Sequence, residues 1–162
     1  MAHGFARAGL GPGDRIAAYG RNSDAYFITW LACVRGGFVH VPVNYALTGE
    51  ELAYIINQSG ARAVIAAPAL EPNLHGISVD IRGRFEDGGE IDVLACALDE
   101  AAPGMPPDPP ITDESLAQIV YTSGTTALPK GAMMTHQAML AQYYSCIHNM
   151  EYARTDRALA AL

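Results

Sequence analysis

The sequence predicts an α/β fold built from alternating strands and helices. Short apolar runs alternate along the first half of the chain with longer amphipathic segments, and glycine-containing turns separate them. This alternation is typical of βαβ units, in which a helix connects two parallel strands. With 162 residues, half of them hydrophobic and 17% charged, the chain has the size and composition of one globular domain.

The first predicted unit begins after a glycine-proline turn at residues 11–14, with a strand at Arg15–Tyr19. Ser23, with Asp24 beside it, is a suitable N-cap for a helix that runs to about residue 34 and ends at two glycines. The apolar residues of this helix recur at helical spacing: Phe27, Trp30, Leu31 and Val34. Phe38–Val43 is the next strand, and Pro42 favours an edge or terminal position because proline has no amide hydrogen.

A second unit follows the same plan. Thr48 and Glu51 match a capping box, and the helix behind them, Leu52–Gln58, places three apolar residues on one face: Leu52, Ile55 and Ile56. Arg62–Ala67 is the strand that follows. Further along, the pattern weakens: residues 86–90 form a loop, residues 91–98 form a strand or a short helix, and the proline-rich residues 103–110 form a surface connector within one fold.

The last part of the chain predicts a strand, a loop, a strand and a helix. Leu116–Tyr121 is an apolar strand, the loop spans Thr122–Gly131, and a short strand at Ala132–Thr135 leads into a helix from about residue 136 to 152. An apolar stripe with the helical period runs along this helix, and we interpret it as core packing: Leu140, Tyr143, Tyr144, Ile147 and Met150.

The composition excludes several classes of function. A formal net charge of −7 leaves no basic stripe that could neutralise nucleic-acid phosphates. The odd and widely spaced cysteines, Cys33, Cys96 and Cys146, indicate reduced thiols in the cytoplasm, and the first and last of them are predicted to be buried. The longest uncharged stretch, Gly131–Met150, contains too many polar groups for a membrane span, and the histidines lack metal-binding spacing.

The residues that carry chemistry follow the strand 116–121: Tyr121-Thr122-Ser123-Gly124-Thr125-Thr126-Ala127-Leu128-Pro129-Lys130-Gly131. Backbone amides near Gly124, the hydroxyl groups and the ammonium of Lys130 are suitable donors for phosphate oxygens, at the carboxyl end of a strand. Composition alone favours a surface turn without a ligand. The order of residues in this loop differs from that of a common P-loop, because the lysine precedes the second glycine. The sequence also lacks the G-x-G-x-x-G pattern, which disfavours a NAD-linked oxidoreductase.

Read in order, Y-T-S-G-T-T-x-x-P-K-G resembles the phosphate-binding signature of the adenylate-forming superfamily of acyl-CoA synthetases, aryl-CoA ligases, luciferases and peptide-synthetase adenylation domains. Other segments look like the N-terminal region of that family, in order and at plausible spacing: residues 13–16, 22–23, 37–44, 51–55 and 135–136. The resemblance implies that residues 1–162 are part of the large N-terminal AMP-binding domain, with layered sheets flanked by helices, truncated at both ends.

The resemblance also implies a two-step ligase reaction. A carboxylate attacks the α-phosphate of ATP to give an acyl-adenylate and pyrophosphate, and the thiol of coenzyme A then displaces AMP. Carried over by motif position, the residues that contact the β- and γ-phosphates are Ser123, Gly124, Thr125, Thr126 and Lys130, with Lys130 as the candidate catalytic residue. Thr122 is similar to the family threonine that helps to hold Mg²⁺. The cofactors implied are ATP and Mg²⁺, with coenzyme A as the co-substrate of the full enzyme.

Two departures from the family pattern affect the activity expected. Ala127 stands where the family has glycine, and a positive φ there costs on the order of 1–3 kcal/mol for alanine. The adenine-binding segment, the ribose-binding aspartate, the acyl pocket and the C-terminal domain with its catalytic lysine are all missing. We therefore expect no turnover from this chain alone. The alternative is a non-catalytic module that binds nucleotide or docks to a partner.

The expected partners are a small-molecule carboxylate and either the remainder of the enzyme chain or a second copy in a homo-oligomer, without nucleic acid and without a transmembrane segment. His136 follows the loop and is interpreted as a capping or packing group at a helix N-terminus, with a phosphate contact as the alternative. His40 lies between two valines and is interpreted as a strand histidine with satisfied hydrogen bonds.

Overall fold

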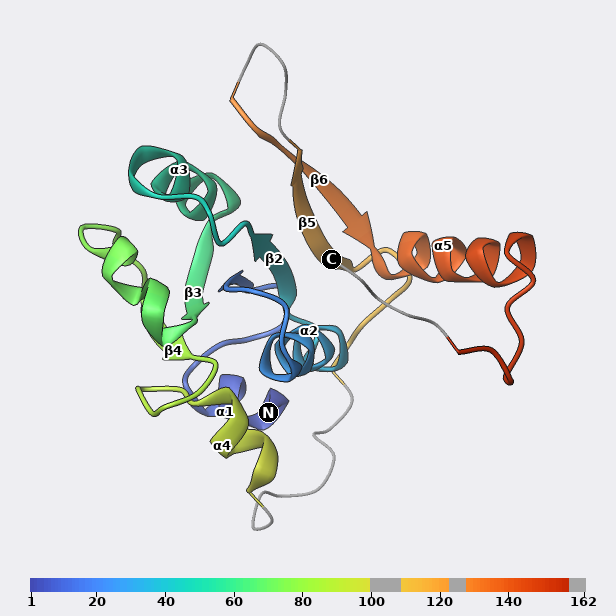
Figure 1. Ribbon diagram of the computed structural model, residues 1–162, viewed down its shortest axis with the longest axis horizontal. Helices are drawn as coiled ribbons and strands as arrows, with labels where there is room; N and C mark the ends of the chain where they lie inside the picture. Colours follow the sequence, from blue (N-terminus) through green and yellow to red (C-terminus); the bar gives the residue numbers. More distant parts are fainter. Residues whose placement is uncertain (100–108, 123–127, 158–162) are drawn as a thin grey trace.

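A six-stranded sheet forms the centre of the computed structural model, which describes residues 1–99, 109–122 and 128–157 (Figure 1). The strand order is β4-β3-β1-β2-β5-β6; the first five strands pair in parallel, and β6 pairs antiparallel with β5. The strands are β1 (Arg15–Tyr19), β2 (Val39–Val43), β3 (Ala61–Ala66), β4 (Ile81–Arg84), β5 (Leu116–Thr122) and β6 (Lys130–Thr135).

Helices cover both faces of this sheet. The covering helices are α1 (Ala2–Arg7), α2 (Asp24–Gly36), α3 (Gly49–Ser59), the 3₁₀ helix η1 (Pro68–Leu74) and α4 (Val93–Leu98), and α5 (His136–Asn149) follows β6. Residues of α1, α2 and α4 share one apolar cluster with one face of the sheet, and residues of α3 and the η1 segment share a second cluster with the other face. The predicted α/β fold with a sheet flanked by helices is confirmed.

Strand β1 lies between β2 and β3 and is buried on both sides. Residues Ile16 to Tyr19 have no exposed surface. Because side chains alternate along a strand, Ile16 and Ala18 pack in the cluster with α2, whereas Ala17 and Tyr19 pack in the cluster with α3. The two apolar clusters therefore meet along this one strand.

Most predicted element boundaries agree with the structure to within two residues. Helix α2 is capped by Ser23, whose Oγ accepts a 3.1 Å hydrogen bond from the Tyr26 amide. Residues 91–98, for which the sequence allowed either a strand or a short helix, contain the helix α4. The predicted capping box of α3 is wrong: the helix does begin after Thr48, but the Thr48 side chain makes no capping hydrogen bond.

Pro42 occupies an internal strand and not an edge. β2 has β1 on one side and β5 on the other. Pro42 is nevertheless next to the last residue of β2, and β5 pairs with β2 at His40, two residues earlier. The ladder with β5 therefore does not depend on the amide hydrogen that proline lacks.

The interpretation of the α5 stripe as core packing is wrong for the part of the chain that the structure describes. Met139 is the buried residue of α5, and Cys146 is only partly buried. The stripe residues are 44–72% exposed: Leu140, Tyr143, Tyr144, Ile147 and Met150. In Figure 1, α5 extends away from the sheet at the end of β6. The helical period correctly identified an apolar face, but no described element covers it.

The predicted connector at 103–110 is described only at its end. Residues 103–108 lie outside the described residues, and Pro110 is exposed. Pro109 packs near the C-terminal end of α2, where Gly37 adopts a left-handed conformation with φ of 74°.

We predict that Gly37→Ala destabilises the chain by about 1–2 kcal/mol, the usual cost of a left-handed conformation for a residue with a Cβ atom. A Cβ atom at this position would also lie 3.3 Å from Cγ1 of Ile111. Gly11→Ala is the matched control, because its φ is not positive and its Cβ atom would have no neighbour closer than 3.9 Å. Chemical denaturation of both variants checks this; equal stabilities would contradict it.

Candidate functional site

The β5–β6 hairpin brings together the two ends of the predicted phosphate loop. Thr122 is the last residue of β5 and Lys130 is the first residue of β6, and the two are direct partners in the antiparallel register. Both side chains are exposed. Because β5 runs parallel to β1–β4, they lie at the carboxyl edge of the sheet, where α/β folds bind ligands. The other predicted contact residues lie outside the described residues: Ser123, Gly124, Thr125 and Thr126.

Lys130 is the only lysine of the sequence, since the other nine basic residues are arginines. No ion pair to it is present within residues 1–99, 109–122 and 128–157. Its ammonium group is therefore exposed and, within those residues, not neutralised by a carboxylate. Such a group can bind an anionic ligand without first breaking an ion pair to these residues.

The close packing of the two hairpin strands leaves no room for a side chain at Gly131. Gly131 pairs with Tyr121, and a Cβ atom built on it would lie 2.7 Å from Cγ2 of Ile119 and 3.2 Å from Cζ of the tyrosine. Real Cβ atoms do not approach other atoms at the first of these distances. The glycine that follows the lysine in the motif therefore allows β6 to pair closely with β5.

Helix α3 contacts the hairpin through two tyrosine hydroxyl groups. Tyr54 donates a 3.2 Å hydrogen bond to the carbonyl oxygen of Pro129, immediately before Lys130. Tyr121 donates to Oε1 of Gln58, and burial, with a smaller contribution from Tyr54, raises the pKa of Tyr121. Sequence reasoning missed both contacts, because a pairing between residues more than 60 positions apart leaves no local pattern.

The described residues do not form a metal site by themselves. Within the described ranges, no group of three or more histidine, cysteine, aspartate or glutamate side chains is arranged to hold a metal ion. Thr122 offers one hydroxyl oxygen, and Mg²⁺ prefers six oxygen ligands, several of them water or phosphate. The donor set fits a magnesium ion that arrives with a phosphate ligand, and it does not fit a site made by this part of the protein alone.

His136 is partly buried and is not the cap of α5. The Thr135 hydroxyl accepts a 3.2 Å hydrogen bond from the Ala138 amide and caps the helix instead. Burial lowers the pKa of His136, and Asp113 opposes that shift. The imidazole Nε2 has no hydrogen-bond partner among the described residues. The packing interpretation holds for this residue, and the capping interpretation does not.

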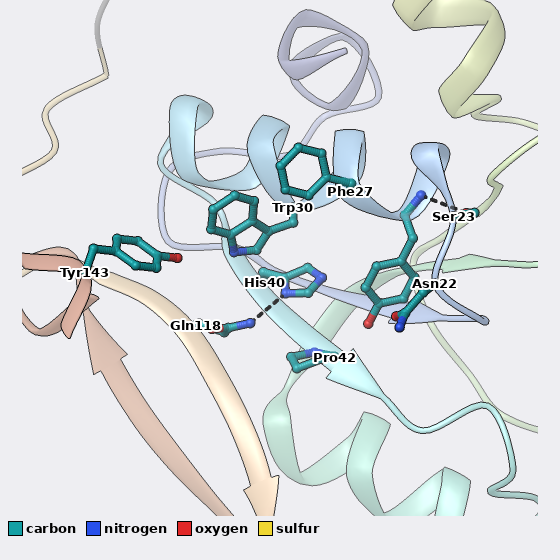
Figure 2. Close-up of a pocket in the computed structure, with 9 residues that line it drawn as sticks. Asn22, Ser23, Phe27, Trp30, His40, Pro42, Gln118 and Tyr143 are labelled. Atoms are coloured by element: carbon teal, nitrogen blue, oxygen red, sulfur yellow. Dashed lines mark hydrogen bonds between the residues drawn. The ribbon is translucent and has the colours of Figure 1, made fainter. Parts of the chain in front are cut away.

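A groove of about 580 Å³ lies between α2 and α5, with His40 and Gln118 at its base (Figure 2). His40 is 1% exposed, and its Nδ1 lies 3.1 Å from Nε2 of Gln118. Its ring packs edge-to-face on Tyr26, with centroids 5.7 Å apart. Burial lowers the pKa of His40 to about 4, so the imidazole is neutral near pH 7. The expectation of satisfied hydrogen bonds holds for Nδ1 only, because Nε2 has no partner within the described ranges.

The comparison with known families decides the assignment. A family model described as "AMP-binding enzyme" matches residues 1–162. The chain belongs to the AMP-binding enzyme family. The resemblance inferred from the phosphate loop is thereby confirmed at the level of the family. Within the residues that the structure describes, no helix combines the length and apolar character that a bilayer crossing needs.

Relatives of this AMP-binding chain include acyl-CoA ligases. It is 36% identical over 161 residues to the feruloyl-CoA synthase of an Amycolatopsis species, covering 99% of this chain and 31% of the relative. The crystal structure of ATP-bound MatB from Rhodopseudomonas palustris is 28% identical with a TM-score of 0.76, covering 91% of this chain and 29% of that one. The chain thus spans less than a third of the length of these two relatives.

A second solved structure matches the whole fold. O-succinylbenzoate coenzyme A synthetase (MenE) from Bacillus subtilis, in complex with AMP, has a TM-score of 0.81 and 25% identity. The match covers 100% of this chain and 40% of MenE. The sheet and helices described above therefore match part of a larger adenylate-forming enzyme.

We predict that His40 makes the chain less stable as the pH falls from about 6.5 towards 4. In the unfolded chain the imidazole has its ordinary pKa of 6.5, whereas burial in the folded chain lowers this pKa to about 4. As the pH falls between these values, the free energy of unfolding decreases by up to about 1 kcal/mol per pH unit. Above pH 6.5 the effect is absent.

Denaturant titrations from pH 7.5 to 4.5 measure this slope. His40→Gln should reduce the slope, and His148→Gln on the exposed surface of α5 is the control that should not. An unchanged slope in His40→Gln would show that the buried imidazole does not contribute.

Proposed function

We propose that this chain is part of an ATP-dependent acyl-CoA synthetase, in which it contributes the loop that holds the polyphosphate of ATP. The observation that carries the proposal is the register of the hairpin, in which Thr122 and Lys130 are direct partners at the carboxyl edge of the parallel strands. Membership of the AMP-binding enzyme family and the similarity to ATP-bound MatB and AMP-bound MenE support it.

The physical task of such a loop is charge neutralisation. A carboxylate must approach ATP, which is a polyanion, and repulsion opposes that approach. Lys130 would place one positive charge beside the β- and γ-phosphates, and hydroxyl and amide donors from Thr122 to Thr126 would bind the remaining oxygens. When bound, Mg²⁺ would supply further neutralisation and stabilise the leaving pyrophosphate, with Thr122 as one candidate ligand.

We further propose that the acyl-adenylate is transferred to coenzyme A and that the protein acts in the cytoplasm. The name of the feruloyl-CoA synthase relative supports a carboxylic acid and coenzyme A as substrates of the whole enzyme. The three cysteines are free thiols in the structure, which is consistent with a reducing compartment. The chemical class of the first substrate is a carboxylate.

We predict that Lys130→Ala impairs ATP use in a chimera in which residues 1–162 replace the matching 161 residues of the Amycolatopsis feruloyl-CoA synthase. Loss of a charge-assisted hydrogen bond, worth about 1.5–3 kcal/mol, should lower feruloyl-CoA formation at limiting ATP roughly 10- to 100-fold. Arg154→Ala removes an exposed cation away from the hairpin and is the control. A Lys130→Ala chimera with unchanged rate and ATP dependence would remove the residue from the site.

The unique lysine permits an independent measurement on the 162-residue chain itself. An amine-reactive acylating reagent can modify only Lys130 and the N-terminal amine, and mass spectrometry distinguishes the two. ATP with Mg²⁺ should slow modification of Lys130 and leave the N-terminal amine unaffected. Equal rates with and without ATP would argue against a phosphate contact.

For the chain alone, we predict no exchange of labelled pyrophosphate into ATP in the presence of a panel of carboxylates. The reason is that the chain spans only 31% of the feruloyl-CoA synthase, and we expect the residues that bind adenine, ribose and the acyl group to lie in the remaining length of such an enzyme. Exchange above the level of a Lys130→Ala control would contradict this expectation and show that this length suffices for the first half-reaction. Binding of ATP without exchange would favour the non-catalytic alternative only if the chimera were also inactive.

A further inference from the structure

The β5–β6 hairpin is well paired within itself but is joined to the rest of the sheet over a short length. β5 and β6 pair along their length, up to Thr122 with Lys130. β2 lies on the other edge of β5 and, among the described residues, pairs with it at a single position, His40 with Gln118. Strand pairing therefore attaches the base of the hairpin to the sheet, and the end that carries Thr122 and Lys130 needs another support.

Apolar packing holds the middle of the hairpin but does not fix the position of its end. Ile119 is 8% exposed and packs in the apolar cluster that contains residues of α3, and Tyr121 packs partly buried against the same cluster. Apolar contacts are non-directional, so they keep the hairpin near α3 without setting its orientation. Hydrogen bonds can set it, because they depend on both distance and angle.

Helix α3 supplies two such hydrogen bonds, one to each side of the hairpin. Tyr54 and Gln58 are four positions apart and therefore lie on the same side of the helix. The Tyr54 hydroxyl donates a 3.2 Å hydrogen bond to the carbonyl oxygen of Pro129, and Oε1 of Gln58 accepts one from the Tyr121 hydroxyl. Figure 1 shows α3 beside the hairpin. The helix thus contacts both strands close to the loop.

The hydrogen bond from Tyr54 acts on the backbone that carries Lys130. The carbonyl group of Pro129 and the amide nitrogen of Lys130 belong to one planar peptide unit, so a bond to that oxygen orients the point from which the lysine side chain extends. The proline ring fixes φ at residue 129 and removes one further degree of freedom. Tyr54 is partly buried, which limits competition from water for this hydrogen bond.

We propose that Tyr54 and Gln58 are positioning residues for ATP, which hold the hairpin so that the ammonium group of Lys130 reaches the β- and γ-phosphates. This inference rests on the proposed function, in which Lys130 contacts the polyphosphate. Neither α3 side chain touches the nucleotide, and both act through the backbone of the hairpin. A helix on one face of the sheet thereby controls the alignment of a binding group at its carboxyl edge.

The first test uses the 162-residue chain without any ligand. Tyr54→Phe and Gln58→Met each remove one hydrogen bond at nearly constant size, and their controls are Tyr144→Phe on α5 and Asn57→Met on α3, both at exposed positions. Amide hydrogen exchange of β6 should be at least about threefold faster in the first two variants than in the controls, with exchange of β1 unchanged. Equal β6 exchange in Tyr54→Phe and Tyr144→Phe would overturn the proposal.

The second test measures ATP use in the feruloyl-CoA synthase chimera. Tyr54→Phe should raise KM for ATP roughly 3- to 10-fold, the range expected for one lost hydrogen bond, and should leave KM for ferulate unchanged. Asn57→Met should change neither value. A purely structural role would reduce the amount of active enzyme without separating the two KM values, and that result would also overturn the proposal.

A double-mutant cycle asks whether Tyr54 acts through Lys130. In the Lys130→Ala chimera, Tyr54→Phe should have no further effect on KM for ATP, because the group that it aligns is gone. Additive effects would show that Tyr54 acts on ATP by another route and would overturn the proposal. An effect of Lys130→Ala without one of Tyr54→Phe counts against the positioning role alone, whereas a Lys130→Ala chimera with unchanged ATP dependence counts against the proposed function.

Discussion

The complete burial of β1 is the constraint on which the rest of the architecture depends. Four consecutive residues of this strand, Ile16 to Tyr19, have no exposed surface. A strand buried on both faces needs a helical layer on each side and a paired strand on each edge. β2 and β3 supply the edges, and the connections through α2 and α3 therefore cover opposite faces. All carboxyl ends of the parallel strands then lie at one edge of the sheet.

The proposed phosphate loop begins and ends at that edge, because the chain changes direction between β5 and β6. β5 arrives parallel to its neighbours, and β6 returns antiparallel, so the chain brings Lys130 back beside Thr122. Gly131 permits the close approach of the two strands, since any larger residue would collide with Ile119. Backbone pairing thereby places Thr122 and Lys130 at the two ends of the loop. Their separation does not depend on side-chain packing within the loop.

Local signals predicted the elements well because each signal acts within a few residues. The N-cap at Ser23 and the left-handed glycine at residue 37 are features of one helix end, and both agree with the structure. The Thr48 cap failed since sequence spacing does not specify a side-chain rotamer. The helical period of α5 identified an apolar face, but what covers a face depends on segments distant in sequence. The same limit explains why the contacts of Tyr54 and Gln58 were missed. It also explains why, among the described residues, only one of the two ring nitrogens of His40 has the expected hydrogen-bond partner.

The two hydrogen bonds between α3 and the hairpin have an evolutionary consequence. The outer side of this helix is polar and exposed, so most substitutions there are expected to be neutral for folding. Tyr54 and Gln58 are exceptions, because they hold the backbone just before Lys130 and the end of β5. Substitutions at Tyr54 and Gln58 would therefore be tolerated less often than substitutions elsewhere on the exposed side of α3, because they would remove the hydrogen bonds that hold the hairpin.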